Sequence, residues 1–299
     1  MHASPHIYTL TGNLLAERTL DYAGWAVGRT QRARRESFHT RGKGVNVSNM
    51  LCRLGAPTTS LIFAGGPSGA ECKNWLTTRG IPYEAFATSA ATRTGTVIWS
   101  DTMAETTFLG PDVPPDDQAI QACAAYLDTR PDGQVLALCG SFPGWDRAGF
   151  EPLRQALVRW LRRGRIAVDA YGPPLAWLAR QPVDFIKING TEFAAHLPGD
   201  SLPERLRTVR AGGPVPCWIV TQGADAVWLI DEAGEPVQFA PPRLAEVSPT
   251  GSGDVLFACI LHARYGIGRS MPDAVRYAIP FAAANAAHPG VADFELPAP

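Results

Sequence analysis

Short apolar runs alternate along the chain with longer segments whose apolar residues recur every three to four positions. The short runs are rich in Val, Ile and Leu and are bounded by Gly, Pro or polar residues, which is typical of strands in a buried sheet. The strand candidates are residues 7–11, 59–64, 96–100, 135–139, 166–169, 185–188, 218–221 and 226–230.

The longer segments have the period of amphipathic helices. The helix candidates are residues 45–54, 69–79, 118–127, 150–163, 175–179, 191–196, 202–211, 253–265 and 271–287. Strands that alternate with helices favour right-handed crossovers, so the pattern predicts an α/β fold with a mostly parallel, doubly wound sheet.

Two polar regions interrupt the alternation. Residues 14–40 form a long, Arg-rich stretch, and residues 93–110 have the pattern of a hairpin, with strands at 94–100 and 105–109 around a polar turn. Both regions are candidates for a small β subdomain beside the main sheet, and ordinary surface excursions are the alternative.

Composition narrows the function classes. The 299 residues are 45% hydrophobic and 18% charged, with 27 Lys and Arg against 28 Asp and Glu. This excludes a disordered chain and argues against a nucleic-acid partner, which would require a basic excess. The chain has no basic leader and no apolar run near the ~18 residues of a membrane span, and its six cysteines form no C-x-x-C pair. We therefore expect a soluble, cytoplasmic protein with no nucleic-acid or membrane partner.

Common nucleotide signatures, including the P-loop and the G-x-G-x-x-G fingerprint, are absent, but a glycine-rich turn stands at residues 41–48, RGKGVNVS. It leads directly into a helix, whose N-terminus favours an anion or sugar hydroxyls, and Asn46 could hold a diol. A purely structural turn explains the same residues equally well.

A second turn stands at residues 248–258, SPTGSGDVLFA, where small residues precede an acid at the start of an apolar helix. Free N–H groups at Gly251, Ser252 and Gly253 would form an anion hole. Asp254 is then either a helix-start carboxylate stabilised by the helix dipole or a general base beside transferring negative charge.

Together, the two turns resemble the two signatures of the ribokinase/PfkB family of carbohydrate kinases. The resemblance covers nearly the whole chain and is nearest to the phosphosugar branch of fructose-1-phosphate, fructose-6-phosphate and tagatose-6-phosphate kinases. Further matching segments are residues 7–13, 140–144 (GSFPG), 187–192 (KINGTE), 221–226 (TQGADA) and 288–290 (HPG).

The resemblance implies a three-layer α/β domain with a small β-sheet lid. The α/β domain would comprise residues 1–11, 42–93 and 111–299, and the lid residues 12–41 and 94–110. Such lids often pair between subunits, so a homodimer through the lid is expected.

The resemblance also implies the site residues and the cofactors. Asp254 would be the catalytic base, and Gly251, Ser252 and Gly253 the anion hole. The implied substrate-binding residues are Glu17, Arg41, Gly42, Lys43, Gly44, Asn46, Arg93 and Ser141, with Arg93 on the phosphate that the sugar already carries. ATP would contact Lys187, Asn189, Thr221, Gly223 and Asn285. Asn189 and Glu192 would organise Mg²⁺ through its waters, and a monovalent cation is a further candidate cofactor.

The chain departs from the family pattern at the sugar end. Glu17 stands where an Asp is usual, and Arg41 replaces a glycine. We expect the two side chains to form an ion pair that narrows the sugar pocket, or Arg41 to point at the acceptor's phosphate beside Arg93. In the competing interpretation Arg41 faces solvent and Asp21 takes the role of the family's Asp.

The expected function is transfer of the γ-phosphate of ATP to a hydroxyl of a ketose phosphate. Two alternatives are a ribokinase-like kinase of an unphosphorylated sugar or nucleoside, and a non-catalytic sugar or nucleotide sensor on the same fold.

Overall fold

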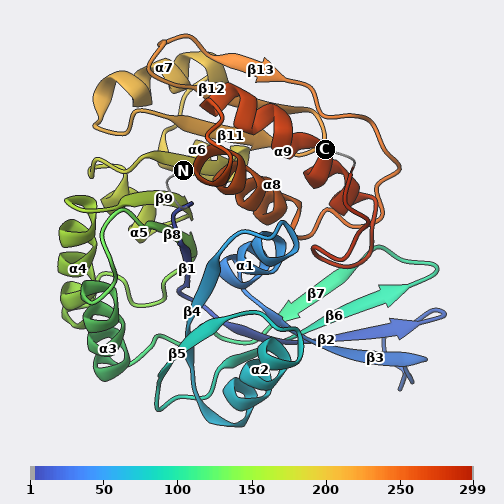
Figure 1. Ribbon diagram of the computed structural model, residues 1–299. Coiled ribbons are helices and arrows are strands. Elements are labelled where there is room, and N and C mark those ends of the chain that lie inside the picture. The colour runs from blue at the N-terminus through green and yellow to red at the C-terminus, as the bar shows by residue number, and fades with distance from the viewer. Residues whose placement is uncertain (1–3, 298–299) are drawn as a thin grey trace.

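The computed structural model describes residues 4–297, and its largest feature is a nine-stranded sheet, which Figure 1 illustrates. The strands follow the order β13-β12-β11-β10-β9-β8-β1-β4-β5; they are parallel from β11 to β5, whereas at one edge β12 pairs antiparallel with both β11 and β13. Their bounds are β1 Ile7–Thr11, β4 Thr58–Ala64, β5 Tyr83–Ala87, β8 Val135–Gly140, β9 Arg165–Ala170, β10 Phe185–Asn189, β11 Trp218–Gln222, β12 Ala226–Ile230 and β13 Val237–Phe239.

Helices cover both faces of this sheet. The helices are α1 Lys43–Arg53, α2 Gly66–Thr78, α3 Asp117–Asp128, α4 Glu151–Leu161, α5 Pro173–Leu178, α6 Gly190–His196, α7 Leu202–Gly212, α8 Ser252–Leu261 and α9 Met271–Ala286. One apolar core joins the sheet to α3, α4, α5, α6 and α7, and a second joins it to α1, α8 and α9. The predicted three-layer, mostly parallel α/β fold is therefore confirmed.

A separate four-stranded sheet, hereafter the lid, extends from the main body (Figure 1). Its order is β3-β2-β6-β7, formed by β2 Leu15–Tyr22, β3 Arg35–Arg41, β6 Arg93–Ser100 and β7 Thr106–Leu109. The predicted hairpin is confirmed, because β6 and β7 pair antiparallel. At the base of the lid, Leu14 and Ala16 pack with Cys72 and Leu76 of α2 in a third apolar cluster.

The strand predictions missed β5 and β13 and did not resolve β2 and β3 individually. β5 is an edge strand with one buried residue, and β13 has three residues, so neither makes a strong apolar run. The predicted helix at 253–265 keeps its α-helical form only to Leu261, and a π-helical turn follows over His262–Gly266. Among residues 4–297, every helix is too short or too polar to cross a membrane.

Candidate active site

Polar side chains collect where the parallel strands of the main sheet end. Asn13 follows β1, Ser141 follows β8, Asp169 lies near the end of β9, and Asn189 ends β10. Ligands of open α/β sheets bind outside the carboxyl ends of the strands, so this edge is the expected place for a substrate. The two glycine-rich turns lie at the same edge, because α1 packs on both α8 and β1.

The turn before α8 requires glycine. Gly251 has a φ of 76° in the left-handed region, and a Cβ added there would lie 2.3 Å from Cγ1 of Val291. The expectation of three free amides needs correction, because the Ser252 N–H donates to the carbonyl oxygen of Pro249 at 3.2 Å. This bond closes the turn, so Gly251 and Gly253 remain the better amide candidates for an anion.

Asp254 lies in the first turn of α8 and is only 6% exposed. Its Oδ2 accepts a hydrogen bond of 2.7 Å from Nδ2 of Asn46 in α1. Burial, assisted by the negative charge of Asp169, raises the pKa of Asp254 to about 6, while Lys43 and Lys187 oppose that shift. A carboxyl group with this pKa is ionised near neutral pH yet can accept and release a proton.

Two lysines share one fully buried carboxylate beside Asp254. Lys43 Nζ lies 2.9 Å from Asp169 Oδ1, and Lys187 Nζ lies 2.9 Å from Asp169 Oδ2. Burial disfavours the charge of Lys43, but nearby carboxylates, Asp169 first, raise its pKa above the ordinary value. The Lys187 ammonium lies close to the glycine turn, since a Cβ added to Gly253 would be 2.7 Å from Nζ.

Asp169 was not among the site residues predicted from the sequence. The available signal was an acid at the end of a strand whose other core positions are all apolar, in the segment RIAVDA. An acid at the carboxyl end of a buried parallel strand is unusual unless it is paired, and here both of its oxygens bind ammonium groups.

The predicted phosphate-binding residue Arg93 lies at the start of β6, with its side chain 13% exposed. Its Nη1 donates to Asp112 Oδ1 at 2.8 Å, whereas its Nε is buried and has no hydrogen-bond partner. Asn13 Nδ2 donates both to the same Asp112 oxygen, at 2.8 Å, and to Ser141 Oγ, at 3.0 Å. The structure therefore brings Arg93 and Ser141 together through Asn13 and Asp112.

The predicted ion pair between Glu17 and Arg41 is confirmed. Arg41 Nε donates to Glu17 Oε1 at 3.1 Å, and both side chains are 10% exposed. Both line a cleft of about 540 Å³ between the lid and the loops before α8 and after α9. The competing interpretation, in which Arg41 faces solvent, is wrong.

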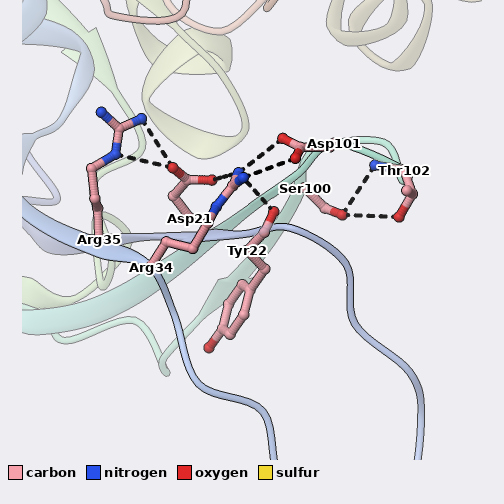
Figure 2. Close-up of polar contacts among 7 residues, drawn as sticks. All are labelled: Asp21, Tyr22, Arg34, Arg35, Ser100, Asp101 and Thr102. Carbon is pink, nitrogen blue, oxygen red and sulfur yellow. Dashed lines mark hydrogen bonds and ion pairs between the residues drawn. The ribbon is translucent and has the colours of Figure 1, made fainter.

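Asp21, which the competing interpretation put in the role of Glu17, lies further out on the lid. There it accepts hydrogen bonds from Arg34 and Arg35, and Arg34 also reaches Asp101 (Figure 2). The hydrogen bonds of Arg34 and Arg35 lower the pKa of Asp21, so this carboxylate is committed to an exposed charge network.

A pocket of about 410 Å³ adjoins the glycine turn on the other side. Its lining includes Thr221 near the end of β11, Gly223 directly after that strand, Leu256 of α8, Ile279 and Ala283 of α9, and Gly253 at the turn itself. A largely apolar pocket of this size next to an anion-binding turn suits a purine nucleotide.

Asn285 does not line this pocket, and its predicted direct contact with ATP does not fit its burial. The residue is fully buried, and its amide donates to Thr250 O and Ser252 Oγ, both at 3.0 Å. Its Oδ1 accepts from the N–H of Ala292 at 2.8 Å. Asn285 therefore supports the turn instead of contacting the nucleotide.

Asn189 and Glu192 form a capping box at the start of α6, in which each side chain bonds the backbone N–H of the other. This local role does not use Glu192 Oε1, which lies 3.6 Å from Lys43 Nζ. Within residues 4–297 no group of three acidic, His or Cys side chains is placed to hold a metal.

Comparisons with known proteins show which family and fold this chain is similar to. The model of the family described as pfkB family carbohydrate kinase matches residues 11–299. The 1-phosphofructokinase of Rhodobacter capsulatus is 29% identical, covering 92% of this chain and 88% of the relative. The D-tagatose-1-phosphate kinase of Klebsiella oxytoca is 28% identical, covering 85% and 84%.

The same fold is present in a solved structure. The phosphofructokinase-2 from Escherichia coli in complex with fructose-6-phosphate superposes with a TM-score of 0.85 at 20% identity, covering 94% of each chain. At that identity the likeness concerns the fold.

Proposed function

The chain belongs to the pfkB family of carbohydrate kinases, and we propose that it transfers the γ-phosphate of ATP to a hydroxyl of a ketose phosphate. The observation that carries this proposal is the buried Asp254 carboxylate, held by Asn46 directly after the Gly251–Gly253 turn. A binding protein has no need of such a base, and a helix-start carboxylate that served only the dipole would not be buried beside a second carboxylate.

In the proposed reaction Asp254 accepts the proton of the acceptor hydroxyl as its oxygen attacks the γ-phosphorus in line. The bond between that phosphorus and the β,γ-bridging oxygen breaks, and ADP leaves. Charge on the transferring group is stabilised by the amides of the turn and by the ammonium of Lys187, which lies beside Gly253. Asn46 donates to Oδ2 of Asp254 and so keeps the carboxylate oriented, while Oδ1 of Asp254 takes the proton.

A kinase of this family uses ATP with a divalent metal. When bound, Mg²⁺ neutralises charge on the phosphates. Asn189 and Glu192 are the residues proposed to position its waters, and Thr221 and Gly223 to contact the nucleotide. The monovalent cation stays a prediction with no residues assigned to it.

Arg93 is the proposed ligand of the phosphate already present on the acceptor. Its Nε is buried without a partner, and a guanidinium with spare donors in a protected position is suited to a phosphate. The names of the relatives make ketose 1-phosphates the first acceptors to test. Lys43, Gly42, Gly44 and Asn46 would hold the sugar hydroxyls.

The test is an ADP-release assay over matched pairs of phosphorylated and free ketoses: fructose 1-phosphate, fructose 6-phosphate, tagatose 1-phosphate, and fructose and tagatose themselves. The proposal predicts that a ketose phosphate has the highest kcat/KM. A free sugar that exceeds every phosphorylated member would establish the ribokinase-like alternative. ADP release without an acceptor measures background hydrolysis and is subtracted.

We further propose a cytoplasmic homodimer that forms through the lid. The six cysteines are free, five of them buried, which suits a reducing compartment. Leu20 pairs with Ile98, and Phe108 pairs with Thr96, two residues before Ile98, so Leu20, Ile98 and Phe108 share one face of the lid sheet, and Phe108 is 58% exposed. Sedimentation of the wild type should give a dimer and Phe108→Asp a monomer. A monomeric wild type at assay concentrations would contradict this assembly.

A further inference from the structure

Asp112 lies between β7 and α3, and the proposed reaction gives it no role. Its Oδ1 accepts two hydrogen bonds of 2.8 Å, one from Arg93 Nη1 and one from Asn13 Nδ2. The two donors are protected, because the Arg93 side chain is 13% exposed and Asn13 is 7% exposed, whereas the Asp112 side chain is 56% exposed. An exposed anion therefore covers a pair of sheltered donors.

A carboxylate oxygen and a phosphate oxygen accept the same hydrogen bonds from a guanidinium and an amide. Asp112 uses only part of what the donors offer, since the buried Nε of Arg93 has no partner. A phosphate has three free oxygens and carries more charge, so it could engage Nη1 and Nε together while also accepting from Asn13. The Asp112 carboxylate thus satisfies only some of the hydrogen-bond donors of Arg93 and Asn13.

Asp112 also has space into which it can withdraw. Together with Ser141 it lines an open pocket of about 440 Å³ that continues past Tyr171. An ion pair with an exposed partner contributes little net stability, so breaking it to solvate Asp112 requires little free energy.

We propose that Asp112 is an internal substitute for the acceptor's phosphate, a specificity-determining residue that the phosphate displaces from Arg93 and Asn13. This inference rests on the proposed function. In the absence of acceptor, Asp112 neutralises the buried guanidinium. A free sugar has no group that can replace the carboxylate, so Arg93 stays paired and the acceptor gains nothing from it. Asp112 therefore opposes the binding of every phosphorylated acceptor to a small and equal extent.

The opposite role is a permanent clamp, in which Asp112 orients Arg93 while the phosphate binds elsewhere on the guanidinium. The two roles predict opposite signs. Removal of a competitor lowers the KM of phosphorylated acceptors, and removal of a clamp raises it.

The experiment compares wild type, Asp112→Ala and Asp112→Asn, with Asp128→Ala as a matched control. Asp128 also forms an ion pair with an arginine, Arg159, but on the surface between α3 and α4. The readouts are kcat and KM for the best ketose phosphate, and the inhibition constant of inorganic phosphate, which probes the slot without the sugar. Thermal melting establishes that each variant is folded.

For Asp112→Ala we expect KM and the inhibition constant of phosphate to fall together by about 2- to 5-fold, the range of an exposed ion pair, with kcat within about twofold of wild type. Asp112→Asn should lie between Ala and wild type, because the amide oxygen still accepts from Asn13. In an Arg93→Ala background the effect of Asp112→Ala should become smaller, because only the competition for Asn13 remains. A rise or no change in KM, or an effect that is undiminished without Arg93, overturns the inference.

Failure of the proposed function is a separate result. It would show as a wild type that prefers free sugars and is not inhibited by inorganic phosphate. A wild type that prefers phosphorylated ketoses, with an Asp112→Ala variant that binds them less tightly, would instead preserve the function and refute the displacement.

Discussion

Asp169→Asn removes the negative charge that Lys43 and Lys187 both contact while nearly conserving the shape of the side chain. Each ammonium loses an ion pair of 2.9 Å, and the Lys187 side chain is only 3% exposed. Breaking a buried pair from one side typically costs about 3–5 kcal/mol. Lys43 is 25% exposed and retains Glu192 at 3.6 Å, so we expect the lower end, about 3 kcal/mol. At ~2–4 °C per kcal/mol this lowers the melting temperature by about 6–12 °C.

The same substitution should change the pH dependence of catalysis. Burial and then Asp169 raise the pKa of Asp254 to about 6. A base acts in its deprotonated form, so kcat/KM of the wild type should fall as the pH decreases through about 6. Without the charge of Asp169, and with both lysines still positive, the pKa of Asp254 decreases. The acidic limb of the profile therefore moves to lower pH.

The assay is the pH profile of kcat/KM, measured by direct product quantification so that no coupling enzyme limits the acidic end. Asp184→Asn is the matched control, because Asp184 also pairs with a cation, Arg165, but at the opposite end of β10. The control should leave the limb in place. An acidic limb in Asp169→Asn that stays at the wild-type pH or moves upward would refute the electrostatic coupling of the two carboxylates.

Three further predictions concern Asp254, Arg93 and Arg41. The buried Asp254 carboxylate destabilises the native state above its pKa of about 6, so Asp254→Asn should raise the free energy of unfolding by about 3 kcal/mol at pH 8. Chemical denaturation of both proteins at pH 8 and pH 5 checks this. The stability gained by the substitution must be smaller at pH 5, because the native carboxyl group of the wild type is then largely protonated. Arg93→Ala should reduce the transition-state stabilisation calculated from kcat/KM by about 2–4 kcal/mol for ketose phosphates, and by much less for free ketoses. Equal losses for all acceptors in the panel would mean that Arg93 is structural. Arg41→Gly should change the ranking of acceptors across the panel. The control is the double variant Glu17→Gln with Arg41→Gly, which leaves no unpaired carboxylate. An unchanged ranking would place Arg41 outside the sugar pocket.

The sequence predicted the layers of the main sheet because its strands are buried on both faces. Each residue of β8 is buried, for example, and such a run is apolar without interruption. The lid was harder to resolve. In β2 the buried residues give way to half-buried ones after Glu17, and β3 is exposed along its first half, so polar and apolar positions mix. These strands are held by pairing with each other and with β6, which is tertiary information.

The residues of the candidate site could be predicted only in part from the sequence, for a related reason. The glycine turns carry their constraints locally: a Cβ on Gly44 would lie 2.4 Å from Thr11 Oγ1, so the sequence retains glycine there. The roles of Asp169, Asn13 and Asp112 depend on partners 126, 99 and 19 residues away along the chain. For Asn285 the sequence-based prediction does not fit the structure. Its position in α9 suggested a nucleotide contact, whereas its burial assigns it to the support of the turn.

The proposed function depends above all on Asp254 as the base of a phosphoryl transfer to a ketose phosphate. The most direct measurement is the single-turnover rate of Asp254→Asn with ATP and the best acceptor, alongside an equilibrium measurement of ATP binding. Since Asn keeps the size of the side chain and can still accept the hydrogen bond from Asn46, only the proton acceptor is lost. We expect a rate about 10²–10⁴-fold below wild type with ATP affinity nearly unchanged. A variant that transfers phosphate at a rate close to wild type would contradict it and leave Asp254 as a helix-start carboxylate.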